Sequence, residues 1–228
     1  MDNREPRPPI RSYVRREGRI TRAQHRALQE LLPVYGLDPE QGIWDLDRAF
    51  GRRAPRLLEI GFGAGETLLQ MAAAHPERDY IGIEVHQPGA GALLLGLHEH
   101  GLTNVRVACA DAALVLQDAV PDEALDGVYL FFPDPWPKKR HHKRRLVQPR
   151  FAELIRRKLK PGGCLRMATD WQDYAEHMMA VMSMAPGFVN AAGARRFAGR
   201  GDRPLTKYER RGQRLGHDVW DLVFTRIP

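Results

Sequence analysis

One acidic residue of this sequence, Asp134, lies between two prolines and just before a dense run of cations. Pro133 and Pro135 restrict the backbone on both sides and disfavour a helix there. Residues 138–145 contain six Lys or Arg and no acid. A carboxylate in a stiff loop beside a polycation suggests chemistry on a polyanion. Each half alone is more often a strand exit or a solvated charge run, so the prediction rests on their adjacency.

The sequence also predicts where Asp134 lies. Residues 128–132 form an apolar run that indicates a buried strand. Asp134 would then follow the carboxyl end of a strand, which is where open α/β sheets bind their ligands.

A second candidate site is a glycine bend. Gly61, Gly63 and Gly65 come between a strand-like run and a helix-like run. Glycines there let a ligand approach the backbone, and the helix that follows offers free N–H groups. A dinucleotide fingerprint would have a third glycine where this chain has Glu66, and an acid at that point opposes a pyrophosphate. Glu59, ahead of the bend, suits a cofactor that carries positive charge.

Two further acids lie at the ends of the next two predicted strands: Glu84 at the end of the second, and Asp111 after the third. Glu84 lies roughly 20 residues past the glycine bend, the spacing expected for a ribose diol ligand. Asp111 is placed where a carboxylate could accept a hydrogen bond from an adenine amine. Either acid alone is more often a helix cap or a solvated loop residue. Their register with Glu59 and the glycines favours one nucleotide-like pocket.

The elements that position these residues alternate regularly from residue 56 onward. The predicted strands are 56–60, 80–85, 104–108, 125–132 and 164–168, and the predicted helices are 65–74, 89–99, one from about 112, 151–159 and 171–184. This alternation predicts an α/β fold with a mostly parallel sheet and helices on both faces. Residues 217–227 predict a longer strand, pairing antiparallel at an edge with a strand around 188–191.

The first residues differ from this body. Residues 1–20 are rich in Arg and Pro and poor in apolar side chains, which predicts a flexible basic arm. Thr21 is expected to cap a helix at 22–32 that Pro33 ends, and Trp44 and Phe50 to anchor this lead-in on the body. The expected domains are therefore an arm at 1–20, a lead-in at 21–55 and one catalytic domain at 56–228.

Charge and cysteine usage narrow the class of protein. The net charge of the 228 residues is +7, of which residues 1–26 contribute +5 and residues 138–145 contribute +6, leaving −4 for the rest. Such a distribution favours a polyphosphate binder with an ordinary body. Cys109 and Cys164 are far apart and lack metal-ligand spacing, so we expect inert thiols and no metal. No signal peptide or membrane-spanning run is present, which favours the cytoplasm. The oligomeric state, monomer or homodimer, is left open.

Three motifs together carry a family resemblance: Glu59-x-Gly-x-Gly-x-Gly65, Gly82-Ile-Glu-Val85 and Pro133-Asp-Pro-Trp136. They resemble class I S-adenosylmethionine-dependent methyltransferases. The chain is most similar to the bacterial tRNA (guanine-N7-)-methyltransferase family, through Arg11 to Arg19, Phe131 to Trp136, Lys143 to Arg145, Ala168 to Trp171, Thr206 to Glu209 and Gly216 to Trp220. The resemblance implies a Rossmann-like class I methyltransferase fold: a seven-stranded, mostly parallel sheet with an antiparallel C-terminal edge strand.

The resemblance also implies roles for residues. S-adenosyl-L-methionine is the implied cofactor, with Asp134 as the catalytic residue, and its expected contacts are Glu59, Gly61, Gly63, Gly65, Glu84, Asp111 and Asp134. The implied substrate is tRNA, and its expected contacts are Lys138, Arg140, Lys143, Arg144, Arg145, Asp170, Thr206, Lys207, Tyr208 and Glu209. Trp136 and Tyr208 could stack on a base, although packing is the commoner fate of such aromatics. Nothing is carried over to residues 185–203.

The implied reaction is methylation of N7 of a guanine in the variable loop of tRNA. Guanine N7 is an acceptor with no proton, so attack on a sulfonium methyl needs no base. Asp134 would therefore orient the guanine and stabilise the emerging cation. Two alternatives stay open: methylation of an exocyclic amine, which must lose a proton, and an RNA-binding protein without activity that has kept its nucleotide pocket.

Overall fold

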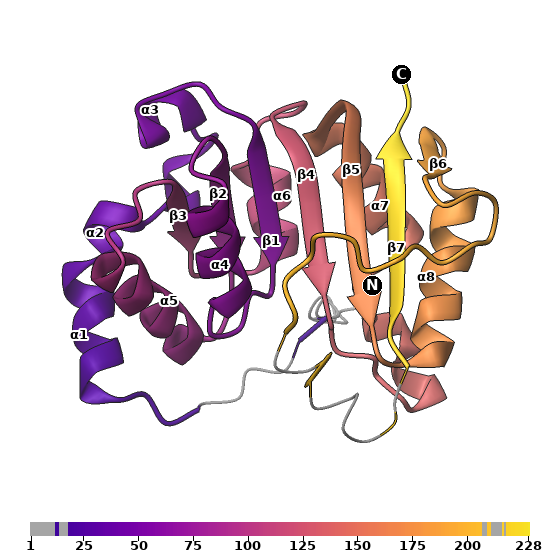
Figure 1. Cartoon of the computed structure of the whole chain (residues 1–228), viewed down its shortest axis with the longest axis horizontal. Helices are drawn as coiled ribbons and strands as arrows, with labels where there is room; N and C mark the ends of the chain where they lie inside the picture. Colours follow the sequence, from indigo (N-terminus) through magenta and orange to yellow (C-terminus); the bar gives the residue numbers. More distant parts are fainter. Residues whose placement is uncertain (1–11, 14–17, 207–208, 211–215, 217) are drawn as a thin grey trace, which may run out of the picture.

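The computed structural model of the chain describes residues 12–13, 18–206, 209–210, 216 and 218–228. Figure 1 shows one sheet with helices packed on it. The strands are β1 (Arg56–Ile60), β2 (Asp79–Ile83), β3 (Val105–Ala108), β4 (Leu125–Phe131), β5 (Leu159–Thr169), β6 (Phe188–Asn190) and β7 (Trp220–Arg226). The helices are α1 (Arg22–Glu30), α2 (Leu32–Tyr35), α3 (Leu46–Phe50), α4 (Glu66–Ala74), α5 (Gln87–Glu99), α6 (Ala112–Asp118), α7 (Pro149–Lys158) and α8 (Gln172–Met184), with 3-10 turns η1 (Pro39–Gln41) and η2 (Lys139–Arg144).

The sheet has seven strands in the order β3-β2-β1-β4-β5-β7-β6. Strands β1 to β5 pair in parallel, and β7 runs antiparallel to both β5 and β6. This confirms the mostly parallel sheet and the antiparallel C-terminal strand. In detail, the short strand β6 forms the edge of the sheet, and β7 lies between β5 and β6.

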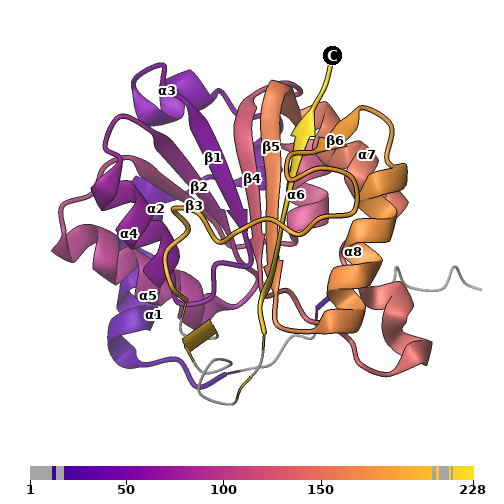
Figure 2. The ribbon, with the colours of Figure 1, turned by 45° about the vertical axis from the view of Figure 1, so that its right-hand side comes forward.

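Two apolar clusters fill the two sides of the sheet. One joins α1, α4 and α5 to the face that carries Leu57 and Tyr80, and the other joins α6, α7 and α8 to the opposite face. The helices thus cover both faces, as the alternation of elements predicts. On the first side, the segment 191–206 crosses β4, β5 and β7, and no helix of the described residues covers these strands there (Figures 1 and 2).

Two predicted boundaries are wrong for local reasons. Pro33 does not end the lead-in helix, because it lies in the first turn of α2, where its missing N–H costs no hydrogen bond. Pro161 and the two glycines after it do not separate α7 from the next strand. They lie inside β5, where the register against β4 shifts between Leu125 and Gly127. A proline is tolerated at such a bulge.

The lead-in packs as expected on the body. Thr21 forms a capping box with Gln24 at the start of α1, and α1 lies on α5. Trp44 is buried in the larger apolar cluster, and Phe50 packs against it. Residues 1–11 and 14–17 of the predicted arm lie outside the described residues. The division of the chain into three domains therefore stays a prediction.

Candidate functional site

A cavity of about 220 Å³ opens where the parallel strands end. Its wall combines the residue after β1, the loops after β2 and β3, and the loop after β4, which contribute Gly61, Glu84, Asp111 and Asp134. A smaller hollow of about 40 Å³ lies beside it and is lined by Glu59, Gly63 and Thr206 among others. Gly61, Phe131 and Phe132 line both spaces. The structure therefore brings together the acids and glycines that the sequence places at separate strand ends.

The glycine bend needs glycine for its backbone. Gly61, Gly63 and Gly65 have φ values of +73°, +60° and +82°, a region that other residues rarely adopt. A Cβ atom on Gly61 or Gly63 would meet no atom within 4 Å. The backbone of the bend is thus left open on the side of the two hollows, which fits a ligand that approaches it closely.

Glu84 fastens the bend to the end of β2. Its carboxylate accepts hydrogen bonds from the backbone N–H groups of Gly63, at 2.9 Å, and of Val85 and His86, at 2.8 and 3.0 Å. Asp111 has a similar local duty, since it caps α6 by accepting from the N–H of Ala113 at 2.9 Å. Both carboxylates also line the cavity, so they can hold the hydroxyl and amine groups of a nucleoside while they order its walls.

Glu59 differs from these acids because it is deeply buried. Only 3% of its surface is exposed, and its Oε2 atom has no hydrogen-bond partner within the described part of the chain. Desolvation, with a smaller contribution from the charge of Glu84, raises the pKa of Glu59 to about 8. A buried acid beside an open glycine bend fits a cationic group of a ligand. The amino group of S-adenosylmethionine is such a group.

The loop that carries Asp134 is strained on both sides. Phe132 and Trp136 have φ values of +52° and +46°, although neither is glycine. Each such residue costs about 1–3 kcal/mol and persists only where its surroundings hold it. Asp134 itself is exposed on the cavity wall. The strain lies where a carboxylate must be aimed, which is typical of functional sites.

The cationic stretch divides into exposed and buried members. Lys138, Arg140 and Lys143 are exposed. Arg144 lies over the ring of Trp136, 4.7 Å from its centroid. Arg145 departs from the expected RNA contact, because its side chain is only 1% exposed and pairs with Asp173.

Arg145 instead supports the Asp134 loop. Its Nε donates to the carbonyl of Pro135 at 2.9 Å, and its guanidinium lies over the ring of Tyr174. The ring of Trp136 is likewise engaged: its Nε1 donates to the carbonyl of Ser12, and His141 meets it edge-on. Trp136 therefore packs in the loop, where the sequence left base stacking open.

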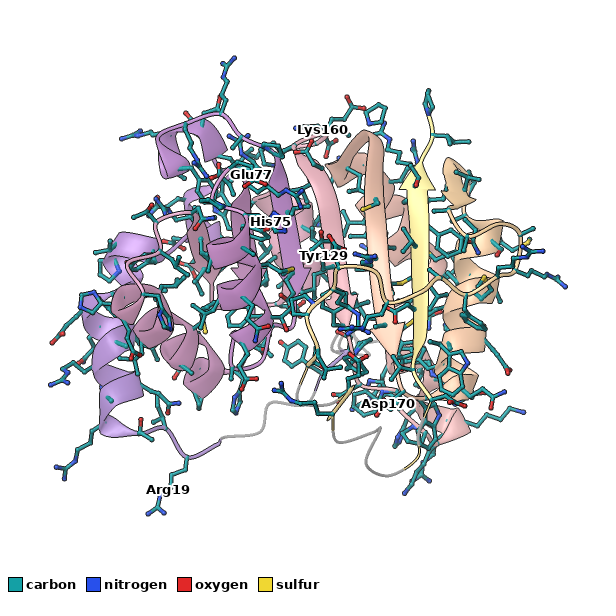
Figure 3. The ribbon with its side chains drawn as sticks, in the orientation of Figure 1. Arg19, His75, Glu77, Tyr129, Lys160 and Asp170 are labelled. Carbon is teal, nitrogen blue, oxygen red and sulfur yellow. The ribbon has the colours of Figure 1, made fainter. Side chains whose placement is uncertain are left out.

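The remaining predicted substrate contacts are spread around the site. Asp170 follows β5 and lies at the edge where β1, β4 and β5 end (Figures 1 and 3). Thr206 lines the smaller hollow, and its Oγ1 accepts from the N–H of Glu209 at 3.1 Å. The carboxylate of Glu209 pairs with Arg203 at 2.6 Å and is buried. Lys207 and Tyr208 lie outside the described residues.

Sequence reasoning missed two residues of this site. Arg203 is fully buried beside Phe131 and Phe132, in a span whose sequence shows no periodic pattern. Gly89, in the first turn of α5, lies against the glycine bend: a Cβ atom there would be 2.1 Å from the carbonyl oxygen of Gly63. The glycine itself is a visible signal, since glycine inside a helix is unfavourable unless packing requires it.

Replacing Gly89 with alanine is expected to weaken cofactor binding by about tenfold or more. The added methyl group would clash with the carbonyl oxygen of Gly63. Because this oxygen belongs to the backbone, the clash must displace the glycine bend itself. Isothermal titration with S-adenosylhomocysteine measures the effect. The control is Gly199→Ala, because a Cβ atom there meets nothing within 4 Å. Equal affinities of both variants would contradict the assignment.

Metal sites and membrane-spanning helices were both considered for the described residues. Within them, no cluster of three or more His, Cys, Asp or Glu side chains is arranged to hold a metal ion. No helix in the same part of the chain has the length and apolar character to cross a membrane.

Solved structures share this fold. A 16S rRNA methyltransferase has a TM-score of 0.59 at 17% identity, over 82% of this chain and 95% of that one. A variant of the 16S rRNA (adenine(1408)-N(1))-methyltransferase from Catenulisporales acidiphilia has a TM-score of 0.52 at 16% identity, over 84% and 92%. The fold is thus the Rossmann-like fold of class I methyltransferases.

The sequence gives a finer match. A family model described as "Putative methyltransferase" matches residues 53–222. The tRNA (guanine-N(7)-)-methyltransferase of Alkalilimnicola ehrlichii is 60% identical over 96% of this chain and 93% of its own length. The protein of that name from Stutzerimonas stutzeri is also 60% identical, over 97% and 94%. The chain belongs to the tRNA (guanine-N(7)-)-methyltransferase family.

Proposed function

We propose that this protein transfers the methyl group of S-adenosylmethionine to N7 of a guanine in the variable loop of tRNA. The observation that carries most weight is that Glu59 is buried beside the glycine bend, in a hollow that adjoins the cavity bearing Asp134. Its Oε2 atom has no hydrogen-bond partner among the described residues. Relatives that are 60% identical over nearly the whole chain bear the name of this activity. The proposal joins that name to the geometry of the site.

The cofactor would be held by residues with separate tasks. Glu59 would pair with its amino group, Glu84 would accept from its ribose hydroxyls, and Asp111 would accept from the adenine amine. Gly61, Gly63 and Gly65 would leave room for it along the bend. When bound, it supplies a methyl group on a positively charged sulfur. A cationic ligand suits a cavity with four carboxylates at or beside its walls.

Asp134 would orient the guanine. Its carboxylate is exposed on the cavity wall and can accept hydrogen bonds from the amine or ring N–H of the base. Its negative charge also favours the cationic product, because positive charge moves to the purine when N7 is methylated. Positioning alone can contribute roughly 7–11 kcal/mol to such a reaction. Asp134 needs no role as a base, since N7 has no proton to lose.

The tRNA would be gripped beside the cavity. The target edge of guanine lies in the major groove, which is too deep and narrow in an RNA helix for side chains, so a loop position fits best. Lys138, Arg140 and Lys143 are exposed next to the Asp134 loop and would contact phosphates. Arg144 and Arg145 would keep that segment in place. Asp170 and residues 206–208 would contact the base or its neighbours, and the buried Glu209 would hold that segment through its ion pair with Arg203. Cytoplasmic location stays a prediction.

Replacing Lys138, Arg140 and Lys143 together with alanine is expected to weaken tRNA binding and to lower its salt dependence. Each phosphate contact adds about 0.7–0.9 to the log-log salt slope, so the slope should fall by about 2–3. Filter binding at several salt concentrations measures this. The matched control is Arg48→Ala, Arg53→Ala and Lys160→Ala. Arg48 lies on α3 and Arg53 pairs with Asp47 of α3, and both α3 and Lys160 lie at the opposite end of the strands (Figures 1 and 3). An unchanged slope would rule out the grip.

The proposed function is tested by one incubation with labelled cofactor and tRNA from a strain that lacks the activity. Nuclease digestion and mass spectrometry should then yield 7-methylguanosine, mapped to the variable loop. If the methyl group is found on an exocyclic amine, the protein is an amine methyltransferase and the proposal is wrong. Binding of both ligands without transfer would support a protein that only binds RNA.

A further inference from the structure

Arg203 is a buried arginine that the proposed chemistry leaves without a role. Its side chain is 0% exposed, and it lies where the segment 191–206 crosses the sheet. Its Nε and Nη2 donate to the two carboxylate oxygens of Asp221 on β7, at 2.9 and 3.0 Å. Its Nη1 donates to Glu209 at 2.6 Å. Burial lowers the pKa of the Arg203 guanidinium, but the hydrogen bonds and charges of Asp221 and Glu209 outweigh it and raise that pKa above its usual value.

The same guanidinium touches the end of the strand that leads to Asp134. It lies 5.4 Å from the ring centroid of Phe131 and 5.6 Å from that of Phe132, within the range of cation–π attraction. Both rings line the cavity and the smaller hollow. Phe132 is also the strained residue two positions before Asp134. Arg203 therefore contacts one of the two residues with a strained backbone that flank Asp134.

The Asp134 loop is held from its two ends by different arginines. Arg203 contacts Phe132 before Asp134, and Arg145 donates to the carbonyl of Pro135 after it. Arg203 also fixes the chain that follows it, because Glu209 is its partner and Thr206 lies between the two. The buried guanidinium of Arg203 thus links the wall of the smaller hollow, which includes Thr206, to the loop that contains Asp134.

We propose that Arg203 is a positioning residue for methyl transfer. It couples Thr206 and Glu209 to the end of β4 and so sets the orientation of Asp134 toward the guanine. This inference rests on the proposed function. Because Arg203 lies behind Phe131 and Phe132 and contacts neither Glu84 nor Asp111, its loss should affect turnover far more than cofactor binding.

The first test is Arg203→Lys, which keeps the charge but not the planar fork that binds Asp221 and Glu209 at once. We expect kcat for tRNA methylation to fall about tenfold to hundredfold, because small misplacements at a reacting centre have effects of this size. The affinity for S-adenosylhomocysteine, measured by titration, should stay within about threefold. A merely structural role would lower both in proportion to the fraction unfolded.

A second variant covers the case in which Arg203→Lys does not fold. Arg203→Met with Glu209→Gln and Asp221→Asn removes the guanidinium without leaving unpaired buried carboxylates, which are strongly destabilising. It should fold, bind S-adenosylhomocysteine and lose at least as much kcat as the lysine variant. The control is Arg166→Met, which breaks the ion pair with Asp202, next to Arg203 in the chain, and should keep kcat within about twofold.

The outcomes separate this inference from the proposed function. Formation of 7-methylguanosine by the unchanged protein tests the function alone. Given that product, a lower kcat with retained cofactor affinity supports the role of Arg203. Wild-type kcat in a folded Arg203 variant, or losses of kcat and cofactor affinity in equal proportion, would overturn it.

Discussion

Replacing Asp134 with alanine is expected to lower kcat for tRNA methylation by about 10²- to 10³-fold, the size found when a preorganised electrostatic group is removed. The carboxylate is exposed on the cavity wall, held between strained Phe132 and Trp136. Without it the guanine loses its orienting acceptor, and the positive charge that develops on the purine loses a nearby counter-charge. Quenched-flow single-turnover assays measure the chemical step directly.

The asparagine variant divides the two parts of this role. Asp134→Asn keeps a hydrogen-bond acceptor but loses the charge. If its rate lies between those of the unchanged protein and Asp134→Ala, the difference from the unchanged protein measures the electrostatic contribution. Asp118→Ala is the control, because Asp118 is an exposed acid at the end of α6. Circular dichroism should give the same melting curve for Asp134→Ala and the unchanged protein. Near-normal turnover of Asp134→Ala would remove this residue from the mechanism.

The sequence predicts the fold and the strand-end acids well because both depend on local patterns. Apolar runs of strand length alternate with helical runs, and in a parallel sheet their carboxyl ends must meet at one edge. Glu59 lies near the end of such a run, and Glu84, Asp111 and Asp134 lie at or just after the ends of three others, so the sequence pattern alone predicts that they meet at adjoining hollows.

Partners of buried side chains could not be inferred in this way. Arg145 belongs by sequence to a cationic run, but its partner Asp173 is 28 residues away. Arg203 lies in a span without pattern, and its partner Asp221 is 18 residues away on β7. Which cation of a run becomes buried depends on such long-range contacts, and residue type alone does not encode them.

Cofactor affinity is expected to depend on pH through Glu59. Burial raises the pKa of Glu59 to about 8, so at pH 7 most molecules carry it protonated when no ligand is bound. A cationic amino group favours the ionised form, and binding must therefore release a proton. The affinity should rise by up to about tenfold per pH unit below pH 8 and level off above it.

Titrations of S-adenosylhomocysteine between pH 5.5 and 8.5, in buffers of different ionisation enthalpy, measure both effects. Close to one proton should be released per ligand near pH 6.5, and less above pH 8. Glu59→Gln should bind more weakly at pH 8 and release no proton. A proton count near zero in the unchanged protein would show that Glu59 does not meet the amino group.

The same residue should make the ligand-free protein less stable at high pH. An unperturbed glutamate has a pKa of 4.5, whereas the pKa of Glu59 in the fold is about 8. Below pH 4.5 both states are protonated and there is no penalty. Between pH 4.5 and 8 the unfolded state loses its proton first, so the stability contributed by this group falls by roughly 3–5 kcal/mol in all. Glu59→Gln should therefore unfold at higher urea concentration than the unchanged protein at pH 8.5, with little difference at pH 4.5. If the unchanged protein binds the cofactor more tightly but is less stable than Glu59→Gln, then Glu59 contributes to ligand binding at the expense of stability.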